Sequence, residues 1–406
     1  MTSTFDSLWE SLLPIGRATR GGGYRRYAWT AADLTCREWF VEAAEQRGMT
    51  VTADRNHNLW AWWLPEGWEG EPRDAFASGS HLDSVPDGGA YDGPLGVVSA
   101  FAATDLLRSK GIRPTKPIGV VSFADEEGAR FGLSCVGSRL ATGLLDADRA
   151  RSLVDDDGTT LAQALRSVGL DPYSLGPDDE ALARIGMFVE LHVEQGRGLV
   201  DVGAPVGLAT AIWPHGRWRF TFSGEANHAG TTRLIDRRDP MLTFADAVLA
   251  ARTHAERADA VATFGRVIVE PGATNGIPAE VRAWLDCRAA DQATLEAVVG
   301  AITGAATLRA ELDRTALAVT AESMTPVVEF ASGPRERLLS VLGDIPCLPT
   351  GAGHDAGILS ARVPTAMLFV RNPTGISHSP LEHAEADDCL AGVEALAAVM
   401  ADWACR

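Results

Sequence analysis

The stretch EPRDAFASGSHLDSVPDGGAYDGPLGVVSAFAATDLLRSKGIRPTKPIGVVSFADEEG, residues 71–128, decides the fold class. Two strand-like runs, EPRDAFASGS and IGVVSFA, flank a helical pattern at residues 96–109. Strands that alternate with helices in this way are typical of parallel βαβ units. The sequence therefore predicts an α/β layer around this stretch.

The same alternation returns towards both ends of the chain. We expect a helix over residues 31–48, a strand over residues 185–193, a late strand in VPTAMLFV and a terminal helix in LAGVEALAAVMADWA. These pieces predict one α/β domain that is built from two parts of the chain, residues 1–212 and residues 331–406.

Residues 213–330 follow a different pattern, which reads strand, helix, strand, strand, helix, strand. This order predicts an inserted ferredoxin-like βαββαβ domain. Domains of this type also bind RNA, but these predicted strands contain no paired aromatic motif of the RNA-binding kind. We therefore expect no nucleic-acid partner.

The composition narrows the choice of partners and compartment. The chain has 406 residues, 36 basic and 54 acidic side chains and a formal charge of −18, which argues against nucleic acids and membrane surfaces as partners. A hydrophobic content of 46% is typical of a globular protein, and neither a membrane-spanning run nor a secretory leader is recognisable. The six cysteines include no CxxC pair, which argues against a disulfide framework. We expect a cytoplasmic protein.

Histidines and carboxylates gather near the predicted strand ends. The histidines are His81 in SGSHLDS, His192 in VELHVEQG and His383 in SHSPLEHAEADD. The carboxylates are Asp92 in GGAYDGPLG and Glu126 and Glu127 in FADEEG. Because ligands bind at the carboxyl ends of strands in an open α/β sheet, these side chains should converge. Imidazoles mixed with carboxylates favour zinc or a similar metal over magnesium.

The spacing of the acidic residues suggests separate tasks. Adjacent residues that leave a strand project in different directions, so one of Glu126 and Glu127 can bind a metal while the other accepts a proton. Asp83 can hold the N–H group of His81, or it can cap a turn. Asp92 lies in a tight turn that can present a carboxylate to two metals. An isolated histidine or acidic loop is often structural or merely solvated, but the joint clustering favours a metal site.

Seven stretches, in order and over nearly the whole chain, resemble the dinuclear metal amidohydrolases of the M20 peptidase clan. They are GSHLDSVPDGGAYDGPLGV, FADEEGARFG, ELHVEQG, EANHAGTT, ATNGIPAEVRAWLDCR, TGAGHDAG and GISHSPLEHAEADD. HVEQG, NHAGTT and GAGHDA are similar to the branch that contains N-carbamoyl-L-amino-acid hydrolase and allantoate amidohydrolase. The resemblance implies a mixed-sheet, metallopeptidase-like catalytic domain.

The resemblance also implies a role for each matching residue. One metal ion would be held by His81, Asp92 and His192, and the other by Asp92, Glu127 and His383, with Asp92 bridging. Glu126 falls on the general base. We expect two divalent ions per subunit, zinc first, with manganese, cobalt or nickel as alternatives because the same ligands serve all of them.

The inserted domain is implied to be the lid and dimerisation domain of a homodimer. His228 in EANHAGTT would reach the partner subunit's active site and stabilise the developing oxyanion. Asn275 and Arg288 fall where the family binds the substrate carboxylate, and Gln195 and His354 fall near the ureido end. The residues themselves agree for Arg288, because a planar, permanently charged side chain on a strand suits a bidentate carboxylate clamp. A surface ion pair is the alternative for Arg288, and turn or loop roles for Asn275 and His228.

Two places depart from the family pattern. His215 in AIWPHGRWRF stands where the family usually has a glutamine that contacts substrate, and FVRNPTG replaces a commoner proline and serine. Both changes bear on the choice of substrate. His57, His254 and His378 lack comparable carboxylate neighbours in the sequence, and we interpret them as structural.

The expected reaction is metal-assisted hydrolysis of a ureido or amide C–N bond in a small carboxylate substrate, either an N-carbamoyl-L-amino acid or allantoate. An aminoacylase or dipeptidase of the same clan is the alternative. A third hypothesis is a binding protein that kept the scaffold without activity, which the complete set of ligands and base disfavours.

Overall fold

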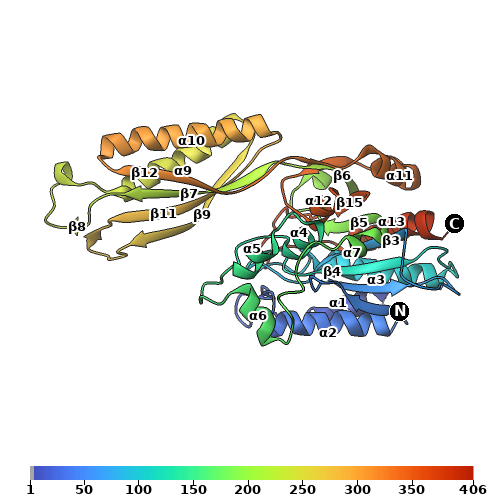
Figure 1. Cartoon of the computed structure of the whole chain (residues 1–406). Coiled ribbons are helices and arrows are strands. Elements are labelled where there is room, and N and C mark those ends of the chain that lie inside the picture. Colours follow the sequence, from blue (N-terminus) through green and yellow to red (C-terminus); the bar gives the residue numbers. More distant parts are fainter. Residues whose placement is uncertain (1–3, 406) are drawn as a thin grey trace. The chain divides into compact units, whose positions relative to one another are not determined.

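The computed structural model describes residues 4–405, and the chain divides into two compact units (Figure 1). Unit 1 comprises Met1–Thr210 and Phe330–Arg406, and unit 2 comprises Ala211–Glu329. In the part of the chain that is described, no helix is both long enough and apolar enough to cross a membrane.

Unit 1 holds most of a nine-stranded mixed sheet with the order β1-β2-β4-β3-β5-β15-β6-β13, in which β14 also pairs with β6. Its strands are β1 (Thr50–Ala53), β2 (Leu59–Trp63), β3 (Ala75–His81), β4 (Ile118–Phe123), β5 (Ile185–Val193), β6 (Val206–Ile212), β13 (Val328–Glu329), β14 (Cys347–Thr350) and β15 (Thr365–Val370). The four neighbours β4, β3, β5 and β15 run parallel. This parallel core confirms the predicted α/β layer, and it directs four strand ends to one edge of the sheet.

The helices of unit 1 are α1 (Thr4–Leu12), α2 (Ala31–Glu45), α3 (Pro94–Ser109), α4 (Val136–Thr142), α5 (Ala147–Ser152), α6 (Leu161–Ser167), α7 (Asp179–Ala183), α8 (Gly198–Val202), α11 (Ser332–Leu342), α12 (Asp355–Leu359) and α13 (Ala386–Ala404). The main core is formed by α1, α2, α3 and α13 with the central strands, and α3 buries almost its entire first three turns. A smaller apolar cluster includes residues of α4, α5 and α6. The central strands are therefore buried, as parallel strands require.

Unit 2 is the predicted βαββαβ domain. Its elements are β7 (His215–Ser223), β8 (Asn227–His228), η1 (Leu234–Asp236), α9 (Pro240–Arg257), β9 (Val261–Glu270), β10 (Gly276–Ile277), β11 (Glu280–Arg288), α10 (Gln292–Asp313) and β12 (Ala316–Thr325). The main sheet has the order β12-β7-β11-β9, and β8 pairs with β10 beyond its end. Alternate residues such as Phe220, Phe222, Val281 and Leu285 are buried, and α9 and α10 lie side by side along one face of the sheet (Figure 1).

The chain enters and leaves unit 2 through two strands that pair with each other. Ala211 and Ile212 at the end of β6 are the Cα partners of Glu329 and Val328 in β13. The first residue of β7, His215, then pairs with Thr325 at the end of β12. Both connections of unit 2 therefore lie at one end of its sheet.

Candidate metal centre

The parallel strands bring the candidate ligands to a common edge. His81 is the last residue of β3 and lies opposite Phe123, the last residue of β4. His192 lies near the end of β5, opposite Phe369 in β15. Glu126 and Glu127 follow shortly after β4, so polar residues at the ends of three strands, β3, β4 and β5, meet at the carboxyl edge of the sheet.

Asp92 occupies the middle of this group. Its Oδ1 atom lies 3.5 Å from His81 Nε2 and 3.1 Å from His192 Nε2. Its Oδ2 atom lies 3.4 Å from His378 Nε2, which is itself 3.7 Å from Glu127 Oε2. Two groups of candidate ligands result, each with its ligand atoms within 4.8 Å of one another: His81, Asp92 and His192, and Asp92, Glu127 and His378. The two oxygens of one carboxylate face the two groups, which is the geometry of a bridging ligand.

A glycine after Asp92 permits this approach. Gly93 has a φ angle of +84°, and a Cβ atom there would lie 2.4 Å from His81 Cε1. Any other residue would be strained in its backbone and would collide with the imidazole. The turn that carries Asp92 can therefore pass directly beside His81 only because of this glycine.

The hydrogen bonds of the two buried histidines decide where their lone pairs point. His192 Nδ1 donates to Val193 O at 2.9 Å, and His81 Nδ1 donates to Asp83 O at 3.1 Å. In the neutral ring the lone pair then lies on Nε2, and both Nε2 atoms face Asp92 Oδ1. Among the described residues, His192 Nε2 is buried without a hydrogen-bond partner. A lone pair directed at a carboxylate needs a proton or a metal cation to offset the repulsion, and two imidazoles with a carboxylate fit a divalent metal.

The negative charge of Asp92 is offset by the histidines around it. Burial raises the pKa of Asp92, but the nearby histidines outweigh it and hold that pKa well below its usual value. The hydrogen bond with Asp92 raises the pKa of His378 to about 9. The site is therefore built to hold positive charge next to Asp92.

Glu126 lies beside these candidate ligands. Its Oε1 atom accepts a hydrogen bond from the Cys135 thiol at 3.1 Å, and its Oε2 atom lies 3.6 Å from His81 Nε2. Burial raises its pKa well above the usual value, against the opposing charge of His81. Asp83 accepts the backbone N–H groups of Glu126 at 3.2 Å and Glu127 at 3.0 Å, so one carboxylate contacts His81 and fixes both glutamates. A buried carboxylate with a raised pKa suits general-base work.

His383 does not join this group, which corrects the expectation from the sequence. Its Nε2 atom lies 3.4 Å from Glu385 Oε1, and its ring contacts Tyr91 edge-on at 6.0 Å. His378, which we had interpreted as structural, lies in its place beside Asp92 and Glu127. The reason is geometric, because the loop after β15 turns back over Asp92 at Ser377 and His378 before it reaches His383.

Gln195 and His354 also lie at the cluster. Gln195 Nε2 donates to Asp92 Oδ2 at 2.8 Å and to Ser377 Oγ at 3.2 Å. The His354 ring lies 4.5 Å from the His192 ring, centroid to centroid, and with Glu190 it forms a third group of candidate ligands. Glu190 accepts hydrogen bonds from Ser80 Oγ at 2.7 Å and Ala356 N at 2.8 Å.

The expected substrate residues of unit 2 lie at two ends of its sheet. His215 and Arg288 are direct Cα partners across β7 and β11, and Arg288 donates from Nε and Nη2 to Asp286 at 2.8 and 3.1 Å. His228 pairs with Gly276, the residue that follows Asn275, at the other end. The nine-residue β11 separates the two ends by roughly 25 Å.

The tautomer of His228 follows from its hydrogen bonds. Its Nδ1 atom accepts from Gly230 N at 2.9 Å and from Thr231 N at 3.3 Å. The neutral ring must therefore carry its proton on Nε2. The residue is exposed, so Nε2–H is available as a donor to another molecule.

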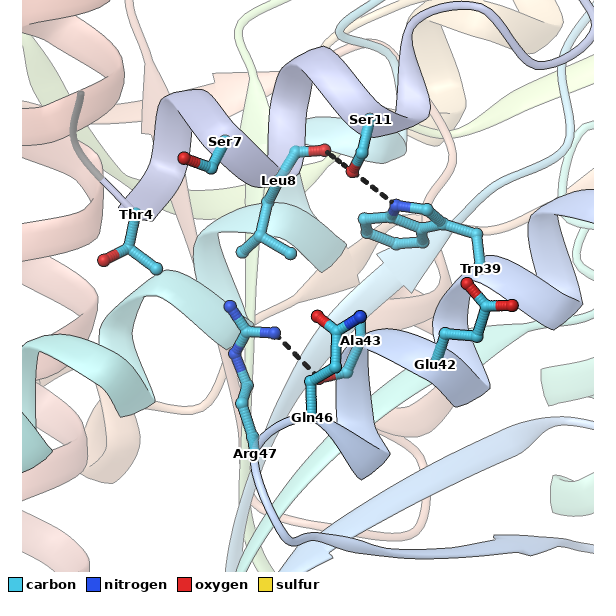
Figure 2. Close-up of a pocket in the computed structure, with 9 residues that line it drawn as sticks. All are labelled: Thr4, Ser7, Leu8, Ser11, Trp39, Glu42, Ala43, Gln46 and Arg47. Carbon is cyan, nitrogen blue, oxygen red and sulfur yellow. Dashed lines mark hydrogen bonds between the residues drawn. The ribbon is translucent and has the colours of Figure 1, made fainter.

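A surface pocket lies between α1 and α2, and none of the candidate metal ligands lines it (Figure 2). It measures about 350 Å³ and is lined by Thr4, Ser7, Leu8, Ser11, Trp39, Glu42, Ala43, Gln46 and Arg47. Its cation, Arg47, donates to Asp105 at 2.7 Å and to Ala43 O at 2.7 Å. We interpret this pocket as a packing feature because its polar groups do not converge on one point.

The comparisons with known proteins agree with this geometry. Residues 77–402 match the model of peptidase family M20/M25/M40. The chain belongs to this family. It is 36% identical over 400 residues to the N-carbamoyl-L-amino acid amidohydrolase of Geobacillus stearothermophilus, covering 96% of each chain, and 31% identical over 398 residues to the allantoate amidohydrolase of Escherichia coli K12, covering 94% and 93%. The crystal structure of a hydantoinase/carbamoylase family amidase from Burkholderia vietnamiensis superimposes with a TM-score of 0.89 at 30% identity, covering 100% of this chain and 99% of that one.

Membership of the M20 family confirms the resemblance and the expected enzyme class. The chain is an M20-type amidohydrolase, and its His, Asp and Glu groups around Asp92 could hold metal ions. Sequence reasoning missed His378, Glu190, Cys135, Ser377 and Glu382 as residues of this centre. Position relative to the strand could have indicated His378, because it is the first histidine after β15.

Proposed function

We propose that this chain hydrolyses a ureido or amide C–N bond in a small carboxylate substrate, either an N-carbamoyl-L-amino acid or allantoate, with two divalent metal ions per subunit. The observation that carries the proposal is the position of Asp92, whose two carboxylate oxygens face two separate groups of ligands beside Glu126. The amidohydrolase names of the relatives support the ureido chemistry.

His81, Asp92 and His192 would hold one ion, and Asp92, Glu127 and His378 the other. When bound, such ions polarise the substrate carbonyl and make water a better nucleophile near neutral pH. Zinc fits the mixture of imidazole and carboxylate ligands, with manganese, cobalt or nickel as alternatives.

Glu126 is the proposed general base. Because Oε1 accepts the Cys135 thiol, Oε2 is the atom placed to take the proton from the attacking water. Glu126 then gives this proton to the departing nitrogen, so one side chain serves both steps. With an N-carbamoyl-L-amino acid the products are the amino acid, ammonia and carbon dioxide, and with allantoate they are ureidoglycine, ammonia and carbon dioxide.

Residues of unit 2 would hold the substrate. Arg288 offers a planar fork for the substrate carboxylate, with Asn275 as the second proposed contact. His215 replaces the family's glutamine, and Gln195 and His354 would lie near the ureido end. His228 would donate from Nε2 to the developing oxyanion, which the backbone hydrogen bonds accepted by its Nδ1 support.

We infer that the active enzyme is a homodimer. Arg288 and His228 lie at opposite ends of unit 2, roughly 25 Å apart, so one small substrate cannot touch both from the same chain. A partner subunit must then supply one of them. Leu234 and Ile235, shortly after His228, are 82% and 74% exposed, which suits burial against a second copy. Unit 2 would thus act as both lid and dimerisation domain.

A cytoplasmic location remains part of the proposal. All six cysteines are free thiols, which fits a reducing compartment.

A substrate panel tests the proposal. The purified protein, reconstituted with Zn²⁺ and with its metal content measured, is assayed on N-carbamoyl-L-amino acids, allantoate, N-acetyl-amino acids and dipeptides. We expect turnover of a carbamoyl compound or allantoate. Turnover of only acetyl or dipeptide substrates would replace the proposal with the aminoacylase or dipeptidase alternative, and two bound ions without turnover of any substrate would favour a binding protein.

A further inference from the structure

The loop after β15 contacts the turn that carries Asp92 through one buried carboxylate. Glu382 is 5% exposed, and its Oε2 atom accepts hydrogen bonds from Tyr91 N at 2.9 Å and from Asp92 N at 3.0 Å. It therefore satisfies two consecutive backbone donors, one of which belongs to the central metal ligand itself.

The second oxygen of Glu382 continues this contact to the Asp92 side chain. Ser377 Oγ lies 3.2 Å from Glu382 Oε1 and 3.2 Å from Asp92 Oδ2. Ser377 directly precedes His378, so Glu382, Ser377 and His378 lie on one loop that meets the Asp92 turn at several points. The backbone and the carboxylate of Asp92 are thus both fixed by this loop.

The Asp92 turn is shaped to accept Glu382 closely. A Cβ atom at Gly89 would lie 2.1 Å from Glu382 Oε2 and 2.5 Å from Glu382 Cβ. The glycine therefore leaves room for the carboxylate, and any larger residue would displace it. Burying Glu382 beside a second carboxylate costs free energy, which the three hydrogen bonds offset in part.

We propose that Glu382 is a positioning residue for the metal centre: by accepting the N–H groups of Tyr91 and Asp92, it fixes the Asp92 carboxylate so that its two oxygens face the two ligand groups. This inference rests on the proposed two-metal site, but it concerns metal binding and not the identity of the substrate. Loss of Glu382 would weaken metal binding because Asp92 is shared by both groups. Groups that orient metal ligands typically change metal affinity by about 10- to 100-fold.

Two conservative variants of Glu382 separate the effect of side-chain length from the effect of negative charge. Glu382→Gln keeps the length of the side chain: its amide oxygen can accept both backbone N–H groups while its NH₂ group donates to Ser377 Oγ. Glu382→Asp keeps the charge but is one methylene shorter, so it cannot reach the two donors. The readout is the Zn²⁺ concentration that half-saturates the protein in equilibrium dialysis against metal buffers, with the number of ions per chain measured by mass spectrometry.

We expect Glu382→Asp to raise the half-saturating Zn²⁺ concentration about tenfold or more and Glu382→Gln by less than about threefold. Gly89→Ala, which displaces Glu382 without removing it, should behave like Glu382→Asp. Glu394→Ala, an exposed glutamate on α13, is the matched control and should bind Zn²⁺ like the parent. Circular dichroism checks that each variant is folded.

Two results would overturn the inference. In the first, Glu382→Asp binds two ions with the parent's affinity. In the second, Glu382→Gln loses as much affinity as Glu382→Asp, which would show that a side chain able to accept both backbone N–H groups does not keep the metal affinity. Because these measurements need no substrate, failure of the proposed activity and failure of this inference are distinguishable.

Discussion

The candidate metal centre of unit 1 and the proposed substrate residues of unit 2 are built in opposite ways. His81, His192 and Asp92 are buried; the two histidines lie at or near the ends of neighbouring strands and donate from Nδ1 to backbone carbonyls, and Asp92 lies in the turn before α3. Arg288 and His228 are partly or fully exposed and stand at two ends of a small sheet. The difference teaches that the candidate metal ligands are preorganised within one unit, whereas the proposed substrate contacts are not gathered at one place in unit 2.

The largest expected effect comes from the proposed base. Glu126→Gln keeps the shape of the side chain but cannot accept the proton, so we expect kcat to fall about 10³-fold while two metal ions stay bound. Steady-state kinetics with metal analysis of the same sample measures this. Unchanged turnover in the loaded variant would refute the role of Glu126.

The second-largest expected effect distinguishes the roles of His378 and His383, the two histidines of the loop after β15. His378→Ala should lose one of the two ions and reduce kcat by about 100-fold or more, because that residue faces Asp92 and Glu127. His383→Ala is the matched control and should keep both ions and nearly full activity. The reverse pattern would restore His383 as the ligand.

A mixing experiment tests whether unit 2 works across subunits. His228→Ala and Glu126→Gln each lower activity as homodimers, by about 100-fold for the oxyanion donor. Random heterodimers of the two variants contain one complete site if His228 serves the partner, so an equal mixture should recover about a quarter of the parent's activity. Measuring activity after co-expression or subunit exchange gives the answer.

The mixture of Arg288→Ala with Glu126→Gln is the control for this experiment. Arg288 lies at the end of unit 2 where the chain enters from its own unit 1, so it should serve its own subunit and the mixture should stay inactive. Recovery in this control, or its absence in the His228 mixture, would contradict the proposed division of roles.

The smallest effect concerns pH. The pKa of His378 is raised from 6.5 to about 9 in the metal-free chain, mainly by its hydrogen bond with Asp92. Metal must displace that proton below pH 9, so Zn²⁺ affinity should rise by about tenfold per pH unit from this residue alone. Titrations between pH 6.5 and 8.5 should give a slope that is about one proton steeper in the parent than in His378→Ala. Equal slopes would contradict this assignment.

Much of the fold could be predicted because the spacing of hydrophobic residues along a strand or helix indicates which of its faces are buried. The buried strands β3, β4 and β5 and the alternating strands of unit 2 each show the pattern that their environment requires. The convergence of His81, Asp92, Glu127 and His192 followed from one rule about strand ends.

The remaining features of the candidate site depend on the conformation of loops, which no hydrophobic periodicity indicates. The loop after β15 places His378 against Asp92 and carries His383 past it to Tyr91, and local composition gives no sign of that turn. The contacts of Cys135 with Glu126 and of Glu382 with the Asp92 turn are equally invisible, because each joins residues through backbone geometry that the sequence does not state.

Because β6 pairs with β13, the segment between these two strands could be deleted without separating the strands themselves. Ile212 and Val328 are Cα partners. If residues 213–327 were deleted, the two ends left at Ile212 and Val328 would therefore lie only about 5 Å apart. A short reverse turn can close such a gap and leave the larger sheet with its edge hairpin. We therefore expect a shortened chain without unit 2 to keep the candidate metal ligands, all of which lie in unit 1, and to lack the proposed substrate contacts Arg288 and His228.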